Sequence, residues 1–181
     1  MDSNSYISSI SCNSGELITI RKLEWIYSYN FLKFLSSNLL DLHDFRGISK
    51  MIIEKSDSYD IPDIMKSIYD GDCFILCAFN KINDIIGFSG VFKKFNIGNF
   101  EIFIDNQYRN KGVGNILINT TLKYSNHLDI QNINLSVRDN NENAIKLYKK
   151  NGFKKIKTIK NNISYKKAIV NEVIMSIELN Y

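Results

Sequence analysis

The chain is poor in proline, cysteine and histidine, with one, three and two of them among 181 residues. A single proline argues against a proline-rich linker or stalk. No apolar run reaches the roughly 18 residues needed to cross a membrane. The first residues lack the basic start and apolar stretch of a secretory signal. The sequence therefore predicts a soluble, cytoplasmic protein without a membrane partner.

Cysteine and histidine are too scarce for a disulfide framework or a zinc site. Cys12, Cys73 and Cys77 cannot all pair, and the last two lie in an apolar run. With only two histidines in the chain, four zinc ligands are poorly supplied. We therefore expect reduced cysteines that pack in the core, and no bound metal.

Length and charge suggest one ordinary globular domain. A chain of 181 residues, 44% of them hydrophobic, can bury one continuous core. The net charge of +4 is mild, whereas a nucleic-acid-binding protein more usually carries a dense basic face or arm. We expect no nucleic-acid partner, a polar and partly frayed N-terminus over residues 1–15, and a single domain over residues 16–181.

The order of periodic segments predicts a mixed α/β fold. Strand patterns cover Glu16–Arg21, Asp72–Phe79, Ile85–Lys93, Asn99–Asp105, Ile133–Arg138, Phe153–Lys160 and Ala168–Leu179. Helical spacing covers Glu24–Leu40, two short stretches between Asp41 and Asp70, Gly112–Asn126, and Asn141–Lys150. These segments predict a twisted, mostly antiparallel sheet of six to seven strands flanked by about four helices.

The most informative segment runs from Ile104 to Gly114, where a strand ends and a helix begins. Its glycines let the backbone approach a ligand, and the helix start adds roughly half a positive charge. Arg109 and Lys111 add full charges. The segment suits a diphosphate, although a helix that needs a tight initial turn has the same pattern. It lacks the third glycine of a dinucleotide fingerprint and the Lys-Ser/Thr pair of a P-loop, which argues against NAD or ATP.

A second informative segment, Leu135–Phe153, predicts a strand and a well-delimited helix. Asp139 and Glu142 resemble a capping box, and Gly152 marks the end of the helix. Tyr148 lies on the apolar face of this helix. Considered alone, such a tyrosine is more often a core residue than a catalytic one.

Together the two segments resemble the GNAT acetyltransferases. The loop Arg109-x-x-Gly-x-Gly, followed by Asn141-x-x-Ala-x-x-x-Tyr148-x-x-x-Gly-Phe153, carries the family's pattern at the family's separation. The resemblance is clearest over Phe100–Phe153. It implies an acetyl-CoA-dependent N-acetyltransferase that acetylates a primary amine directly. Its partners would be CoA and an amine, and a homodimer is possible.

The resemblance also implies roles for individual residues. Those expected to bind acetyl-CoA as a co-substrate are Ile102, Phe103, Ile104, Arg109, Asn110, Lys111, Gly112, Val113, Gly114 and Asn141. Tyr148 would be the general acid that protonates the departing thiolate, and Glu101 is the candidate base. Asn141 is also an ordinary helix cap, and Glu101 equally fits an exposed strand residue. Asn110 stands where the family often has glycine, but asparagine tolerates left-handed turns.

The acceptor amine stays open at this stage. In the family, recognition usually comes from segments corresponding to Phe31–Pro62 and Asn161–Lys167 here, where Asp41, Asp44 and Tyr165 are candidates. A small amine and a peptide N-terminus both fit. The alternative function is a non-catalytic acyl-CoA-binding or sensing module, against which an intact Tyr148 argues.

Overall fold

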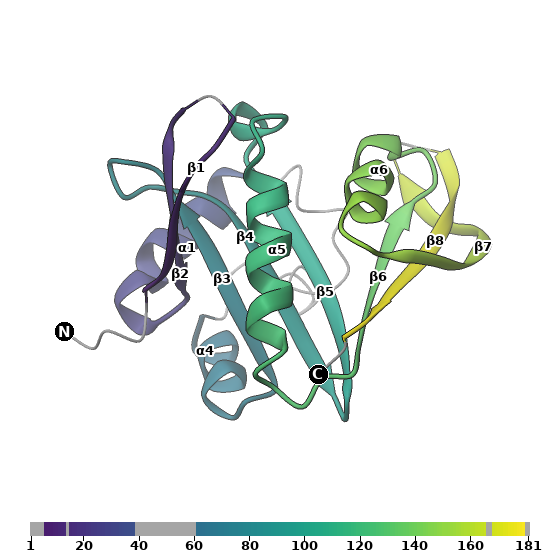
Figure 1. Ribbon diagram of the computed structural model, residues 1–181, viewed down its shortest axis with the longest axis horizontal. Coiled ribbons are helices and arrows are strands. Elements are labelled where there is room, and N and C mark those ends of the chain that lie inside the picture. Colours follow the sequence, from purple (N-terminus) through teal and green to yellow (C-terminus); the bar gives the residue numbers. More distant parts are fainter. Residues whose placement is uncertain (1–5, 14, 39–60, 166–167, 180–181) are drawn as a thin grey trace.

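Eight strands among the described residues form one continuous sheet (Figure 1). The structure is a computed structural model that describes residues 6–13, 15–38, 61–165 and 168–179. The strands are β1 (Tyr6–Ser11), β2 (Leu17–Lys22), β3 (Cys73–Phe79), β4 (Ile85–Lys94), β5 (Ile97–Ile104), β6 (Asn132–Arg138), β7 (Lys154–Tyr165) and β8 (Ala168–Glu178). Their order is β1-β2-β3-β4-β5-β6-β8-β7, and only β5 and β6 pair in parallel.

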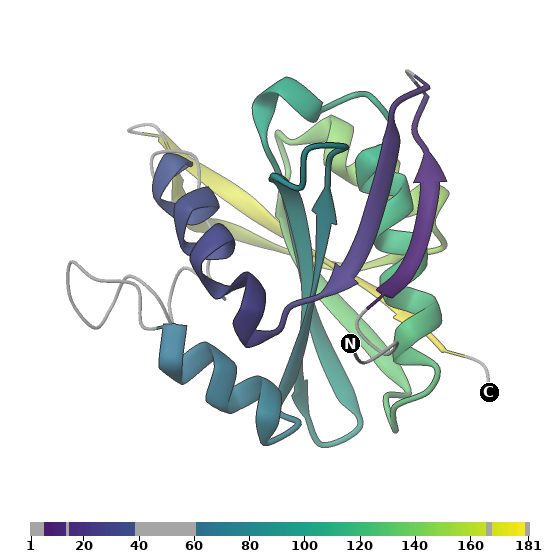
Figure 2. The same cartoon turned by 90° about the vertical axis from the view of Figure 1, so that its left-hand side faces the viewer.

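Helices cover both faces of this sheet (Figure 2). One face carries α1 (Ser28–Ser37), which follows the short 3-10 helix η1 (Trp25–Tyr27), and α4 (Ile61–Tyr69). The other face carries α5 (Val113–Ser125) and α6 (Glu142–Lys150). Within the described part of the chain, no helix is both long and apolar enough to cross a bilayer.

The predicted mixed α/β fold with a mostly antiparallel sheet is confirmed, but the strand count is eight instead of six to seven. The additional strand is β1, which lies in the segment expected to be a polar terminus and pairs with β2. Its sequence, Tyr-Ile-Ser-Ser-Ile-Ser, lacks a strict apolar alternation, so periodicity did not reveal it. Of the two short helices expected over residues 41–70, α4 is one, and residues 41–60 lie outside the described residues.

An aromatic cluster joins the sheet to α1. Phe88 of β4 is fully buried and contacts Phe31 and Phe34 edge-on, with ring centroids 5.3 and 6.3 Å apart. Phe103 of β5 stacks on Phe88 at 6.3 Å and meets Phe34 at 5.8 Å. This packing holds α1 beside the C-terminal end of β5, where the predicted site begins.

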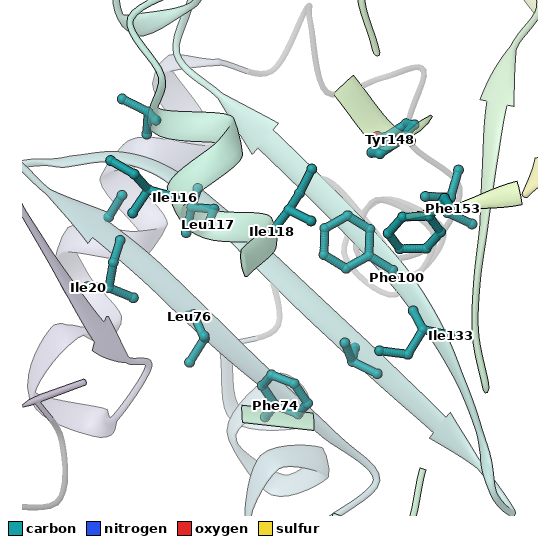
Figure 3. Packing of buried hydrophobic residues seen from close by; sticks show 14 of the residues in the cluster. Ile20, Phe74, Leu76, Phe100, Ile116, Leu117, Ile118, Ile133, Tyr148 and Phe153 are labelled. Carbon is teal, nitrogen blue, oxygen red and sulfur yellow. The ribbon is translucent and has the colours of Figure 1, made fainter. Parts of the chain in front are cut away.

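The opposite face is packed by α5 (Figure 3). Leu117 and Ile118 of this helix are fully buried against apolar residues of the central strands. A hydrogen bond of 2.6 Å between the buried hydroxyls of Ser89 and Thr121 adds a directional link between β4 and α5. The start of α5 is therefore held firmly next to the end of β5.

The cysteines pack in the core as predicted. Cys12, Cys73 and Cys77 are all buried thiols. Burial, with a smaller contribution from the charge of Asp72, raises the pKa of Cys73 to about 12, and burial raises the pKa of Cys77 as well. These two thiols therefore stay protonated and unreactive at neutral pH. Across the described ranges, no three potential ligand side chains gather as a metal site.

Replacing Phe88 by alanine should destabilise the fold by about 3–5 kcal/mol, because the change leaves a cavity among three aromatic rings. Phe95→Ala is the matched control, since Phe95 is 85% exposed. It should change stability by about 0.5 kcal/mol or less. Urea unfolding of both variants measures the difference, and equal losses would contradict this assignment of the core.

Candidate active site

Strands β5 and β6 separate toward one end of the sheet (Figure 1), and a cleft forms between them. The two strands pair only over Ile97–Asn99 and Asn132–Asn134. Beyond these residues β6 stays paired with β8, and β5 stays paired with β4. A cleft of about 1330 Å³ lies between the diverging strands, with α5 and α6 contributing to its walls. It is large enough for an extended ligand.

The main chain of β5 faces this cleft at two predicted positions. The N–H of Asp105 donates to the carbonyl of Ile86 at 3.0 Å, while Ile104 lies opposite Gly87. Residues of an antiparallel pair point their main-chain groups alternately toward and away from the partner strand. The N–H and C=O groups of Ile102 and Ile104 therefore point toward the cleft.

Phe103, predicted with its two neighbours, has a different position. Its main chain faces β4, and its ring packs in the aromatic cluster beneath α1. The alternation of a strand explains this difference, because successive residues face opposite ways. Phe103 is nevertheless among the residues that line the cleft.

The loop after β5 combines a short 3-10 helix, η2 (Asn106–Tyr108), with two left-handed residues. Asp105 begins it by accepting a hydrogen bond from the N–H of Gln107 at 2.8 Å. Asn110 has φ 62° and Gly112 has φ 92°. Asn110 thus adopts the left-handed conformation that glycine most often provides and that asparagine tolerates. Gly112 has the same type of conformation, and there the loop turns into α5.

The predicted loop residues divide between the cleft and the interior. Arg109, Asn110, Gly112 and Gly114 line the cleft. Lys111 is not among the lining residues; its Nζ lies 4.8 Å from the centre of the Tyr108 ring. Val113 is 1% exposed and packs in the core.

Arg109 and Gly114 hold the loop against β5. The Nε of Arg109 donates to the carbonyl of Ile104 at 2.9 Å, and its guanidinium lies 5.6 Å from the centre of the Phe103 ring. A Cβ atom at Gly114 would lie 3.0 Å from both Ile104 Cδ1 and Leu147 Cδ2. The lack of a side chain here lets the start of α5 approach β5 and α6 closely.

Asn141 is both a helix cap and a cleft residue. Its side-chain oxygen accepts a hydrogen bond from the N–H of Ala144 at 3.3 Å at the start of α6. The predicted capping box at Asp139 is wrong, because this carboxylate accepts a hydrogen bond from Asn171 of β8 at 2.7 Å. The N-cap is therefore Asn141 instead of Asp139, while α6 begins at Glu142, within one residue of the predicted start. Asn141 also lies in the cleft wall.

Gly152 ends α6 as predicted. It has φ 92°, its N–H donates to the carbonyl of Lys149, and the N–H of Phe153 donates to the carbonyl of Tyr148, both at 3.1 Å. This is the hydrogen-bond pattern of a Schellman cap. The cap places Phe153 beside Tyr148 at the end of the helix.

Tyr148 lies in the cleft wall and is held by aromatic neighbours (Figure 3). It is 8% exposed, and its ring centre lies 6.3 Å from that of Phe100 and 5.9 Å from that of Phe153. Burial, with the negative charge of Glu101 as a second cause, raises the pKa of the Tyr148 phenol above its ordinary value. The phenol is therefore protonated throughout the neutral range. Glu101 lines the same cleft from β5.

The sequence interpretation missed Glu172 of β8. This glutamate is 5% exposed, lines the cleft, and accepts hydrogen bonds from the hydroxyl of Ser136 and the amide of Asn162. The sequence feature that could have indicated it is a glutamate inside an otherwise mainly apolar strand. Only the pairing of β8 with both β6 and β7 brings its two donors together.

A family profile for the acetyltransferase (GNAT) family matches residues 40–153. The chain therefore belongs to this family, whose members use acetyl-CoA, and it is by class an N-acetyltransferase. No curated protein sequence matches the chain.

Solved structures of acetyltransferases share the fold. A GNAT-family acetyltransferase from Streptococcus pneumoniae is 21% identical, with a TM-score of 0.76 over 90% of this chain and 99% of that one. Spermidine N-acetyltransferase from Vibrio cholerae, solved with CoA and spermine, is 23% identical, with a TM-score of 0.68 over 90% and 95%. Ribosomal-protein-S5-alanine acetyltransferase from Vibrio fischeri is 15% identical, with a TM-score of 0.74 over 90% and 93%.

The close approach at Gly112 can be tested by comparing two glycines. Both Gly112 and Gly71 have positive φ, but a Cβ atom at Gly112 would lie 2.9 Å from Asn13 Oδ1, whereas nothing lies within 4 Å at Gly71. Gly71→Ala should therefore cost about 1 kcal/mol of stability from backbone strain alone. Gly112→Ala should cost little more than that, because its Cβ meets only the end of the exposed Asn13 side chain, which can turn aside. Urea unfolding measures both, and a cost at Gly112 more than about 1 kcal/mol above that at Gly71 would contradict this freedom of Asn13.

Proposed function

We propose that this protein transfers the acetyl group of acetyl-CoA directly to a primary amine, on a small molecule or a peptide N-terminus. The arrangement that carries the proposal is one cleft with three parts. Main-chain groups of Ile102 and Ile104 lie on one side, the Arg109–Gly114 loop at one end, and Tyr148 with Glu101 in the walls. We also propose that it works in the cytoplasm as a single domain over residues 16–181, to which β1 adds an edge strand. A homodimer remains a prediction.

The loop and the strand end fit the two polar parts of acetyl-CoA. Main-chain N–H groups at the start of α5 and the charge of Arg109 suit the diphosphate. The N–H and C=O groups of Ile102 and Ile104 suit the amides of the pantetheine arm, as an added strand would. An N–H at this strand end would also polarise the thioester carbonyl, as in an oxyanion hole. Asn141, in the opposite wall, is placed for a further contact.

Tyr148 supplies the proton that the departing thiolate needs. An ordinary phenol has a pKa near about 10 and a thiol near about 8.5, so transfer to the thiolate is uphill by about 2 kcal/mol. Burial increases that cost, because it raises the pKa of Tyr148. The positive charge that develops on the attacking amine offsets part of it. The raised pKa has the benefit that Tyr148 stays protonated, and so remains able to donate, at neutral pH.

Glu101 removes the proton of the amine, directly or through a water molecule. An amine with a pKa near about 10 is uncharged in only about one molecule in a thousand at pH 7. A carboxylate in the cleft both attracts the ammonium form and accepts its proton. Glu101 and Tyr148 line the same cleft, and the charge of Glu101 raises the pKa of the phenol, which supports one site for the proposed base and acid.

The acceptor is best sought among cationic amines. The cleft is lined by Glu101 and Glu172 together with Arg109, Arg138, Lys146, Lys150 and Lys157, so a positively charged amine is favoured only close to the two carboxylates. The similar structures include enzymes named for spermidine and for a ribosomal-protein alanine, so a polyamine and a peptide N-terminus both belong in the search.

The first experiment is thiol release from acetyl-CoA by the purified protein with polyamines, amino sugars, amino acids and short peptides. Turnover with one class of amine would identify the acceptor. CoA binding without release by any amine would favour the binding or sensing module instead. Failure to bind CoA at all would refute the proposal.

Replacing Tyr148 by phenylalanine should lower kcat by about 10²–10⁴-fold, the usual contribution of a positioned proton donor. The dissociation constant of CoA should change by less than about twofold, because the aromatic contacts with Phe100 and Phe153 remain. Tyr69→Phe, at a residue that is 91% exposed, is the control and should leave kcat unchanged. An unaltered kcat in Tyr148→Phe would remove this residue from the mechanism.

Replacing Glu101 by glutamine should lower kcat/KM most at pH 7 and progressively less toward pH 10. At high pH the amine loses its proton without help, so the base becomes dispensable. Glu178→Gln, an exposed site, is the control. A pH–rate series for both variants measures the effect, and a loss independent of pH would mean that Glu101 only positions the substrate.

A further inference from the structure

The turn between β1 and β2 lies against the loop that begins α5 (Figure 1). The main-chain N–H of Asn13, in this turn, donates to the carbonyl of Lys111 at 2.9 Å. A hydrogen bond within the turn closes it, because the N–H of Gly15 donates to the carbonyl of Cys12 at 2.9 Å. A segment outside the family match of residues 40–153 is thereby fixed to the predicted phosphate loop.

The side chain of Asn13 lies directly over Gly112. A Cβ atom at Gly112 would meet Asn13 Oδ1 at 2.9 Å and Nδ2 at 3.2 Å. The same side chain is exposed and lines the cleft with Ile10 and Ser11, beside Arg109 and Asn110. The β1–β2 turn therefore forms part of the wall at the diphosphate end.

We propose that Asn13 is an additional acetyl-CoA-binding residue whose side-chain amide donates a hydrogen bond to a CoA phosphate oxygen. The inference rests on the proposed function. An amide can present either its N–H₂ or its oxygen after a half-turn, so the donor can face an anion without backbone movement. Its main chain is already held by Lys111, so little conformational freedom is lost on binding. Because the amide is neutral, the negative charge of the phosphates is still compensated by Arg109 and the start of the helix.

The test is the dissociation constant of CoA, measured by calorimetry for the full-length protein and three variants at low and high salt. Asn13→Ala should weaken binding about fivefold, the effect of losing one ordinary hydrogen bond at an exposed site. Asn13→Asp should weaken it tenfold or more, and less at high salt, because a carboxylate repels the diphosphate. Asn126→Asp, at the other end of α5 and roughly 20 Å away, should bind like the wild type.

Pantetheine, which has no phosphate, separates direct contact from distortion of the loop. All variants should bind it equally; a parallel loss for pantetheine and CoA would overturn the phosphate contact. Wild-type affinity for CoA in both Asn13 variants would overturn this inference alone. A wild-type protein that does not bind CoA would instead overturn the proposed function. If thermal unfolding shows Asn13→Asp to be misfolded, Asn13→Ala and Asn13→Ser decide the question.

Discussion

The separation of β5 from β6 is the constraint on which the rest of the site depends. Their ladder stops after three residue pairs, while each strand continues on its other side with an antiparallel partner. The main-chain groups of Ile102 and Ile104 consequently face a cleft and not a neighbouring strand. Main-chain groups seek hydrogen-bond partners wherever they lie, so this edge is suited to a ligand that carries amides. The gap in the sheet is thus the basis of the recognition that we propose.

The aromatic residues beside the gap explain how it stays open without collapsing. Phe100, Tyr148 and Phe153 contact one another at ring distances of 5.9 to 6.3 Å where the strands begin to diverge. This cluster ties α6 to β5, and the Schellman cap at Gly152 sets the position of Phe153. The same burial that secures the ring of Tyr148 raises the pKa of its phenol. Packing and proton chemistry are therefore coupled at this residue.

Local patterns predicted the regular elements well, because apolar periodicity reports which face of a helix or strand is buried. They failed where a polar segment gains its structure from a partner. Strand β1 has mostly serine at its polar positions and exists as a strand through pairing with β2. The capping residue of α6 was misassigned for a related reason, since Asp139 accepts a hydrogen bond from Asn171 and Asn141 caps the helix instead. The contact of the Lys111 ammonium group with the Tyr108 ring is likewise not visible in the sequence pattern.

The sequence by itself determined the class of the protein and the types of group at the site. The left-handed loop residues Asn110 and Gly112 and the spacing from Arg109 to Tyr148 are local properties that can be read along the chain. Only the tertiary structure decided which groups meet. Tyr148 and Glu101 come from different elements, Glu172 joins them from β8, and Asn13 reaches the loop from the first hairpin. The physical reason is that such contacts follow from strand order and divergence, and neither leaves a periodic trace in the sequence.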